Sequence, residues 1–141
     1  MEAERDLRTL LGGMRPELNP GRYVFTTVPG DAVPAGVRPV VTVAEPEGLT
    51  LVLPESEAVS AGLGHDFTAA WITLRVHSAL DAVGLTAAVA LALTDAGVSC
   101  NVVAGFHHDH LFVPCDRGEE ALGVLEALAA ESAREPGRGS R

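Results

Sequence analysis

The sequence predicts an α+β fold in which an antiparallel sheet carries its helices on one face. Three observations support this prediction. Hydrophobic residues make up 47% of the 141 positions, enough for the core of one domain or of two small halves. Short β-branched segments alternate with segments of helical spacing. The second half has the order strand, helix, strand, strand, helix, which is the ferredoxin-like βαββαβ order without its last strand.

The first half supplies strands and two short helices. Leucines at helical spacing predict the first helix, which Gly12 and Gly13 end. Runs of β-branched and aromatic residues between Pro/Gly-rich turns predict the strands. The elements expected here are a helix over 4–13, a strand over 23–28, a hairpin of strands 40–45 and 49–53, and a helix over 54–63.

The second half continues with longer elements. Those expected are a strand over 69–76, a helix over 78–97 that Gly97 caps, strands over 98–106 and 110–115, and a helix over 118–133. The first half has spare strands that could fill the place of the missing last strand. We therefore expect two halves that share a sheet, over 1–65 and 66–133, and a tail over 134–141 that is disordered by composition.

The helix expected over 78–97 has almost no polar side. Between positions 80 and 93 the polar residues are Asp81 and Thr86, and at about 100° per residue they form no solvent face. A helix that is apolar on nearly all sides must be covered on nearly all sides. Either the first half packs over it, or a partner subunit does.

Composition argues against several classes of partner. The net charge is −9, no lysine is present and the ten arginines are scattered, so no basic stripe is available for nucleic acid. The acidic balance would repel anionic membranes, and no apolar run approaches the roughly 20 residues of a membrane span. The acidic N-terminal start lacks signal-peptide features, so we expect a cytoplasmic protein with reduced thiols.

Three of the five histidines lie in the stretch VVAGFHHDHLFVP, residues 102–114. If His108 and Asp109 form a two-residue turn, His107 pairs with His110, and Phe106 with Leu111. Every residue on one face of the hairpin is then apolar, and this face includes Cys100 and Cys115. The two thiols would be diagonal neighbours, too far apart for an unstrained disulfide, and are expected to be small core residues.

The other face of this hairpin would place His107 and His110 side by side. Histidines at a hairpin tip are most often solvated turn residues, which is the simplest interpretation. A ligand contact through either imidazole is one alternative. A metal site is another, with His107, Asp109 and His110 as the candidate ligands, although a catalytic zinc needs three converging protein ligands.

The stretch LDAVGLTAAVALALTDAGVSCNVVAGFHHDHLFVP resembles the ACT domain, a small regulatory module that binds amino acids. The chain from about residue 5 to 130 is similar to a family of small stand-alone bacterial proteins built from two ACT-like halves. The same ACT subtype occurs in aspartokinase regulatory regions and in cytosolic arginine sensors. The resemblance implies a loop containing Asp81 and Gly84 before the helix. Many ACT modules have proline just before this glycine, where this chain has Val83.

The resemblance implies a site for an amino acid at this loop. Backbone N–H groups at a helix N-terminus can hold its carboxylate, and a carboxylate or carbonyl groups can hold its ammonium. Helix capping is an equally good explanation for Ser78 and Asp81. The expected ligand-binding residues are His77, Ser78, Ala79, Leu80, Asp81, Gly84, Asn101 and Val102.

The function expected from these features is a non-catalytic regulatory or sensor protein. It would bind an amino acid or a similar small molecule at a domain or dimer interface, as a homodimer and without a cofactor. No nucleophile–base pair, phosphate loop or paired carboxylates are visible in the sequence. The alternatives are a metal-binding protein or small enzyme that uses the cluster His107–His110, and a domain that only binds another protein.

Overall fold

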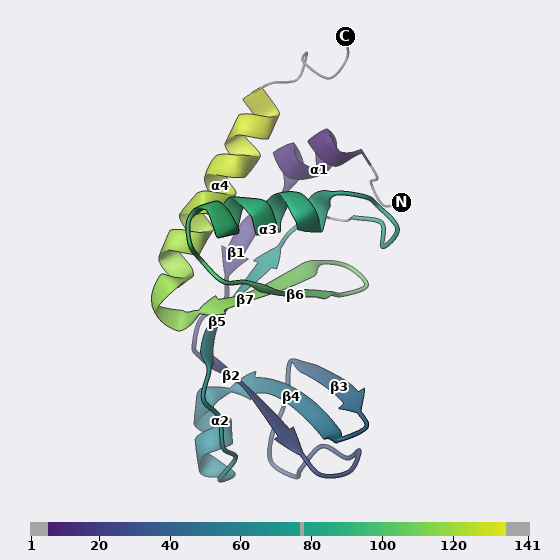
Figure 1. Cartoon of the computed structure of the whole chain (residues 1–141), viewed down its shortest axis with the longest axis vertical. Helices are drawn as coiled ribbons and strands as arrows, with labels where there is room; N and C mark the ends of the chain where they lie inside the picture. The colour runs from purple at the N-terminus through teal and green to yellow at the C-terminus, as the bar shows by residue number, and fades with distance from the viewer. Residues whose placement is uncertain (1–5, 77, 135–141) are drawn as a thin grey trace.

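The computed structural model describes residues 6–76 and 78–134. Its strands form one seven-stranded antiparallel sheet in the order β3-β4-β2-β5-β7-β6, with β1 also paired to β5 (Figure 1). The elements are α1 (Leu7–Gly13), β1 (Pro16–Leu18), β2 (Tyr23–Val28), β3 (Val41–Glu45), β4 (Gly48–Pro54), α2 (Glu55–Ser60), β5 (Thr68–Leu74), α3 (Leu85–Asp95), β6 (Asn101–Ala104), β7 (Asp109–Pro114), the short 3-10 helix η1 (Cys115–Arg117) and α4 (Gly118–Arg134). The α+β class and the ferredoxin-like order are confirmed.

Strand β5 belongs to both halves of the molecule. Its first residues pair with β2, so that it completes the N-terminal half in the order β3-β4-β2-β5. Its last residues pair with β1, where Pro16 lies opposite Leu74, and β7 lies along its other side. Strand β1 was not predicted, because the sequence just before residue 23 has the composition of a Pro/Gly-rich turn. This short strand occupies the place of the missing last strand in the order β1-β5-β7-β6.

The N-terminal half lacks the first helix of the βαββαβ order. Between β2 and β3, residues 29–40 form turns and irregular backbone, and buried Val37 packs with the core beneath β2 and β4. Three prolines and two glycines in residues 29–39 explain why no helix forms there. The proposed division of the chain at 65/66 lies just before β5, and it stays a prediction because β5 serves both halves.

Alternation along the strands sorts the side chains onto two faces of the sheet. On one face, Ile72, Leu74, Leu111 and Val113 pack beneath α1, α3 and α4. The same face in the N-terminal half carries Val24, Leu51 and Leu53, which pack with α2 and the 29–40 loop. The opposite face holds the aromatic cluster, a name used here for Tyr23, Phe25, Phe67, Trp71 and Phe112. Burial on both faces gives two cores that share one sheet.

Helix α3 begins later than the apolar pattern predicts. Residues 78–84 form a loop, and Gly84 precedes the helix with a φ of 104°, a left-handed conformation that favours glycine. The predicted cap at the other end is confirmed: Gly97 has a φ of 75°, and its N–H bonds to the Thr94 carbonyl. The predicted start at residue 78 is wrong because apolar spacing alone does not reveal this break.

One side of α3 stays exposed in the single chain. Leu85, Val89 and Leu93 are buried against the sheet and the neighbouring helices. Leu91, on the outer side, is 61% exposed. The first half therefore does not cover the whole apolar surface of this helix, and the alternative of a partner subunit remains for its outer side.

The β6–β7 hairpin has the predicted faces but a different register. Ala104 lies opposite Asp109 and Val103 opposite His110, so a four-residue loop, Gly105–His108, joins the strands. Within this loop the Gly105 N–H donates to the His108 carbonyl at 2.9 Å. The predicted pairs His107–His110 and Phe106–Leu111 are wrong. The shift is by two positions along each strand, so each strand residue keeps its predicted face.

Several further predictions concern single residues or chain ends. Both cysteines are free, and burial raises the pKa of the Cys100 thiol to about 11, consistent with a core residue.

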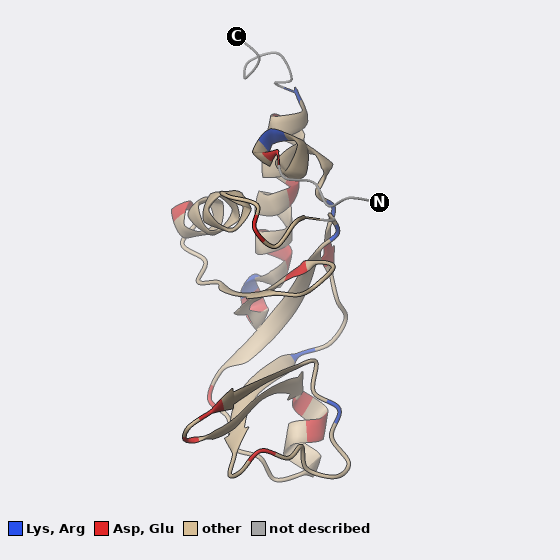
Figure 2. Ribbon diagram, turned by 90° about the vertical axis from the view of Figure 1, so that its right-hand side faces the viewer, with Lys and Arg blue, Asp and Glu red and all other residues tan. Residues whose placement is uncertain are grey.

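In the part of the chain that the structure describes, no helix is long and apolar enough to span a membrane. Figure 2 shows arginines dispersed over both halves. Residue 134 ends α4, whereas the rest of the predicted tail, 135–141, lies outside the described residues.

Candidate functional site

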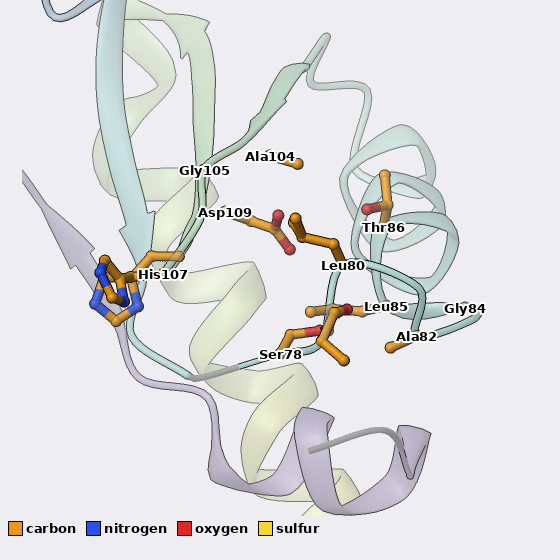
Figure 3. A pocket seen from close by; sticks show the side chains of 12 residues that line it. Ser78, Leu80, Ala82, Gly84, Leu85, Thr86, Ala104, Gly105, His107 and Asp109 are labelled. Atoms are coloured by element: carbon orange, nitrogen blue, oxygen red, sulfur yellow. Dashed lines mark hydrogen bonds between the residues drawn. The ribbon is translucent and has the colours of Figure 1, made fainter. Parts of the chain in front are cut away.

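A cavity of about 110 Å³ lies between the 78–84 loop, the start of α3 and the end of the β6–β7 hairpin (Figure 3). Leu80, Leu85 and Thr86 line it from the loop and the helix. Ala104 and Asp109 line it from the hairpin. Two segments that most of α3 and the strand after it separate in the sequence thus meet around one small space.

The α3 end of this cavity offers backbone donors that the helix itself does not use. The first α-helical hydrogen bond runs from the Ala88 N–H to the Gly84 carbonyl at 2.9 Å, so the N–H groups of Leu85, Thr86 and Ala87 are not needed within the helix. Gly84 has no side chain to cap them. Helix N-termini carry partial positive charge, and this one therefore suits a carboxylate or another small anion.

Asp109 supplies the opposite charge. It is the first residue of β7, lies opposite Leu74 on β5 and Ala104 on β6, and is partly buried. Its carboxylate points into the space between the hairpin and α3, toward Leu80 (Figure 3). Burial raises the pKa of Asp109, while the nearby His110 and His108 act in the opposite direction. A cation bound here would relieve the cost of burying this charge.

The structure brings only some of the predicted site residues to this cavity. Ser78, Ala79, Leu80 and Gly84 line it, together with Ala82, Leu85 and Thr86, which were not predicted. Asp81 is exposed and is not among the lining residues. Asn101 and Val102 lie toward the other end of β6. His77 lies outside the described residues, and the binding roles of all eight predicted residues remain predictions.

Asp109 was predicted as a candidate metal ligand but not as part of this site. A usable signal was present, because Asp109 is two residues from Leu111 and so lies on the same face of β7. That face packs against the helices. The predicted two-residue turn placed Asp109 at the tip of the hairpin and so outside the strand. The observed four-residue loop places it in β7, on the face toward the helices.

The hairpin histidines do not form one cluster: the rings of His107 and His108 lie 6.4 Å apart and both residues line the cavity, whereas His110 lies apart from them. The His107 side chain is directed away from the Asp109 carboxylate (Figure 3). His110 turns to the other face of the sheet, where its Nδ1 lies 3.1 Å from the indole nitrogen of Trp71. Within residues 6–76 and 78–134, no group of three His, Cys, Asp or Glu side chains is arranged to hold a metal.

Comparison with known families identifies the class to which this fold and site belong. A model of the ACT domain matches residues 2–70, and a second ACT-domain model matches residues 67–127. The chain belongs to the ACT-domain family and carries two such domains. ACT domains are typical of regulatory modules that bind amino acids.

Solved structures extend this comparison. A Vibrio cholerae protein of unknown function, described as a possible transport protein, is 48% identical, with a TM-score of 0.79 over 87% of this chain and 95% of that chain. An Agrobacterium tumefaciens protein is 20% identical, with a TM-score of 0.65 over 82% of this chain and 89% of that chain. The search of curated proteins gave no significant match.

Regulatory parts of aspartate kinases share the same fold. The regulatory subunit of the Thermus flavus enzyme is 11% identical, with a TM-score of 0.58 over 80% of this chain and 95% of that chain. At this identity the comparison shows the fold alone. It establishes that the arrangement of two ACT domains seen here also occurs in a regulatory subunit.

Proposed function

We propose that this protein is a regulatory module that binds a small amino acid or a similar zwitterion in the cavity between α3 and the β6–β7 hairpin. The observation that carries the proposal is the pairing of two opposite charges across one small space. Leu85 and Thr86, whose N–H groups are not used within the helix, line one side, and the partly buried carboxylate of Asp109 lies at the other. Membership of the ACT-domain family supports the same class of ligand.

A free amino acid matches both charges of the cavity. Its carboxylate would accept hydrogen bonds from the start of α3, and its ammonium would pair with Asp109. Gly84 allows the backbone to approach a ligand closely because it has no side chain and adopts a left-handed φ. A ligand with only one of the two charges would leave either the helix donors or the carboxylate without a partner.

The size of the cavity favours a short ligand. Its volume of about 110 Å³ is several times the roughly 30 Å³ that a water molecule occupies in the liquid. Leu80 and Leu85 form apolar walls beside the two charged ends. Long side chains would have to extend out of the cavity or displace Leu80, which is 67% exposed.

A thermal-shift panel of the common amino acids tests this proposal. At least one should raise the melting temperature at millimolar concentration, because a ligand that binds only the folded state stabilises it by about 2.7 kcal/mol at 100 times its Kd. The N-acetyl and carboxamide derivatives of that amino acid are the matched controls, since each removes one of the two charges. No shift from any amino acid, or equal shifts from the blocked derivatives, would contradict the proposed site.

We also propose that the protein acts as a homodimer that uses the outer side of α3 and the edge of β6. Leu91 is 61% exposed on this helix, and β6 forms the end of the sheet with its outer edge unpaired in the described chain. An exposed apolar helix beside an open strand edge favours association with a second sheet. Two copies related by a twofold axis would cover both features at once.

Replacing Leu91 with glutamate is expected to convert this dimer into a monomer, because two buried carboxylates would face each other near the twofold axis. Analytical ultracentrifugation measures the change in mass. Val59→Glu is the matched control, since Val59 is a 66% exposed aliphatic residue on α2, away from the proposed interface. A wild-type mass equal to that of one chain would refute the dimer, and so would an unchanged mass for Leu91→Glu.

A further inference from the structure

His110 joins β7 to β5 through a network of side-chain hydrogen bonds on the aromatic face of the sheet. The indole Nε1 of Trp71 donates to His110 Nδ1 at 3.1 Å. The Thr73 hydroxyl lies 3.3 Å from the same nitrogen, and Asn19 Nδ2 donates to that hydroxyl at 2.9 Å. His110 is also directly opposite Thr73 in the strand register. Nδ1 of His110 therefore accepts the hydrogen bond of the indole N–H and also lies within hydrogen-bond distance of the Thr73 hydroxyl.

The chemistry of the indole fixes the protonation state of this nitrogen. An indole N–H is only a donor, so His110 Nδ1 must be unprotonated to accept its bond. A second proton on the imidazole would occupy Nδ1 and place two donors against each other. The Trp71–His110 bond is then lost, and the charged ring is left beside a largely apolar cluster.

We propose that the Trp71–His110 hydrogen bond is a proton-controlled contact, closed when His110 is neutral and opened when it is protonated. Opening loosens the attachment of β7 to β5 next to Asp109, which follows His108 and precedes His110 in the hairpin. The consequence for ligand binding rests on the function proposed above. A protonated His110 also places a positive charge near the carboxylate that would hold the ligand ammonium, so acid should weaken binding.

The charged and titratable groups around His110 come from several elements. His108 and Asp109 belong to the same hairpin, and Arg75 follows β5. Glu17 on β1 pairs with Arg75 at 2.7 Å, and Tyr23 on β2 contacts the indole edge-to-face at 5.2 Å. Burial lowers the pKa of His110. The charges of His108 and Arg75 lower it further, and the charge of Asp109 acts in the opposite direction. The midpoint of His110 protonation therefore lies below the usual pKa of 6.5.

The sign of the effect on stability follows from this direction. The unfolded chain takes up the proton first as the pH falls below about 6.5, because the pKa of His110 is lower in the folded state. The contribution of neutral His110 is thus fully present above that pH. It is lost as the pH falls toward the lower pKa of the folded protein.

Trp71 is the only tryptophan in the chain, so it gives a single indole N–H signal in the NMR spectrum of the ¹⁵N-labelled protein. This signal should move upfield in one step as the pH is lowered from about 7.5 to 5, with a midpoint below that of an exposed histidine. His110→Asn keeps an acceptor oxygen near the position of Nδ1 but does not titrate, so its signal should stay constant. His107→Asn, which removes another imidazole from the same hairpin, should keep the wild-type step.

A wild-type indole signal that does not titrate, or a step that persists in His110→Asn, would overturn the proposal. The ligand arm is separate. The affinity for the amino acid found in the thermal-shift panel should fall on the order of tenfold over the same pH range, within the usual size of coupling between sites. His110→Asn should flatten this fall, and an unchanged pH dependence would refute the coupling. If no amino acid binds at any pH, the proposed function is refuted. The indole titration still tests whether protonation of His110 breaks the Trp71–His110 hydrogen bond.

Discussion

Asp109→Asn is expected to weaken amino-acid binding by about 100-fold or more without making the unliganded protein less stable. Asparagine has nearly the shape of aspartate, but it cannot supply the charge that pairs with the ligand ammonium. Removing one partner of a desolvated charge pair costs about 2–5 kcal/mol of binding free energy. Isothermal titration calorimetry with the amino acid from the thermal-shift panel measures the loss.

The stability of the same variant provides an internal control. Burial raises the pKa of Asp109, so the ionised carboxylate is less favourable in the folded state than in the unfolded chain. The wild-type protein therefore loses stability as the pH rises from about 3.8, the usual value, through the raised pKa, and Asp109→Asn avoids this loss. A variant that binds the amino acid as tightly as wild type would refute the site. A variant with a lowered melting temperature at pH 7 would indicate a structural role for the carboxylate.

Phe112→Ala is expected to destabilise the protein by about 3–5 kcal/mol, the usual cost of truncating a fully buried phenylalanine. Phe112 is 0% exposed at the centre of the aromatic cluster. Its ring meets Phe25 edge-to-face at 5.6 Å and stacks beside Trp71 at 6.2 Å. Because Phe25 is on β2 and Phe112 on β7, the truncation removes packing between the two halves. Urea denaturation monitored by circular dichroism measures the change.

Phe106→Ala is the matched control for that experiment. It removes the same side chain from the same hairpin, but Phe106 lies in the loop and is 76% exposed. Its effect on the free energy of unfolding should stay within about 0.5 kcal/mol, as for most surface substitutions. Equal effects at positions 106 and 112 would show that the aromatic cluster contributes little to the fold.

Much of the fold was predictable because local patterns specify it. The strand over 23–28 and the hairpin after it are rich in β-branched residues between turn signals, and the structure places β2, β3 and β4 there. Gly97 as the end of α3 follows from the left-handed conformation that glycine adopts most easily. Strand β1 was not predictable in this way. A strand of three residues is too short to show an alternation of apolar and polar side chains. Its pairing, with Pro16 opposite Leu74, depends on tertiary contacts.

The site was only partly predictable because it depends on a loop length. A helix N-terminus at this place was predicted, but with its start at residue 78, whereas α3 begins at Leu85 after Gly84. The carboxylate that faces this N-terminus depends on where the β6–β7 hairpin reverses. Both a two-residue and a four-residue loop keep Leu111 and Val113 on the buried face, so the face pattern could not choose between them. Only the four-residue loop places Asp109 in a strand beside the cavity.

The pairing of β1 with β5 sets an order of events during synthesis of this protein. Residues 16–18 leave the ribosome first, yet their partner strand at 72–74 follows roughly fifty residues later. At about 5–20 residues per second, the leading segment waits several seconds for the strand that receives it. The N-terminal half also needs β5 before its own sheet is complete. Neither half can finish folding on the nascent chain before β5 emerges, and the C-terminal half must then wait for β6, β7 and α4.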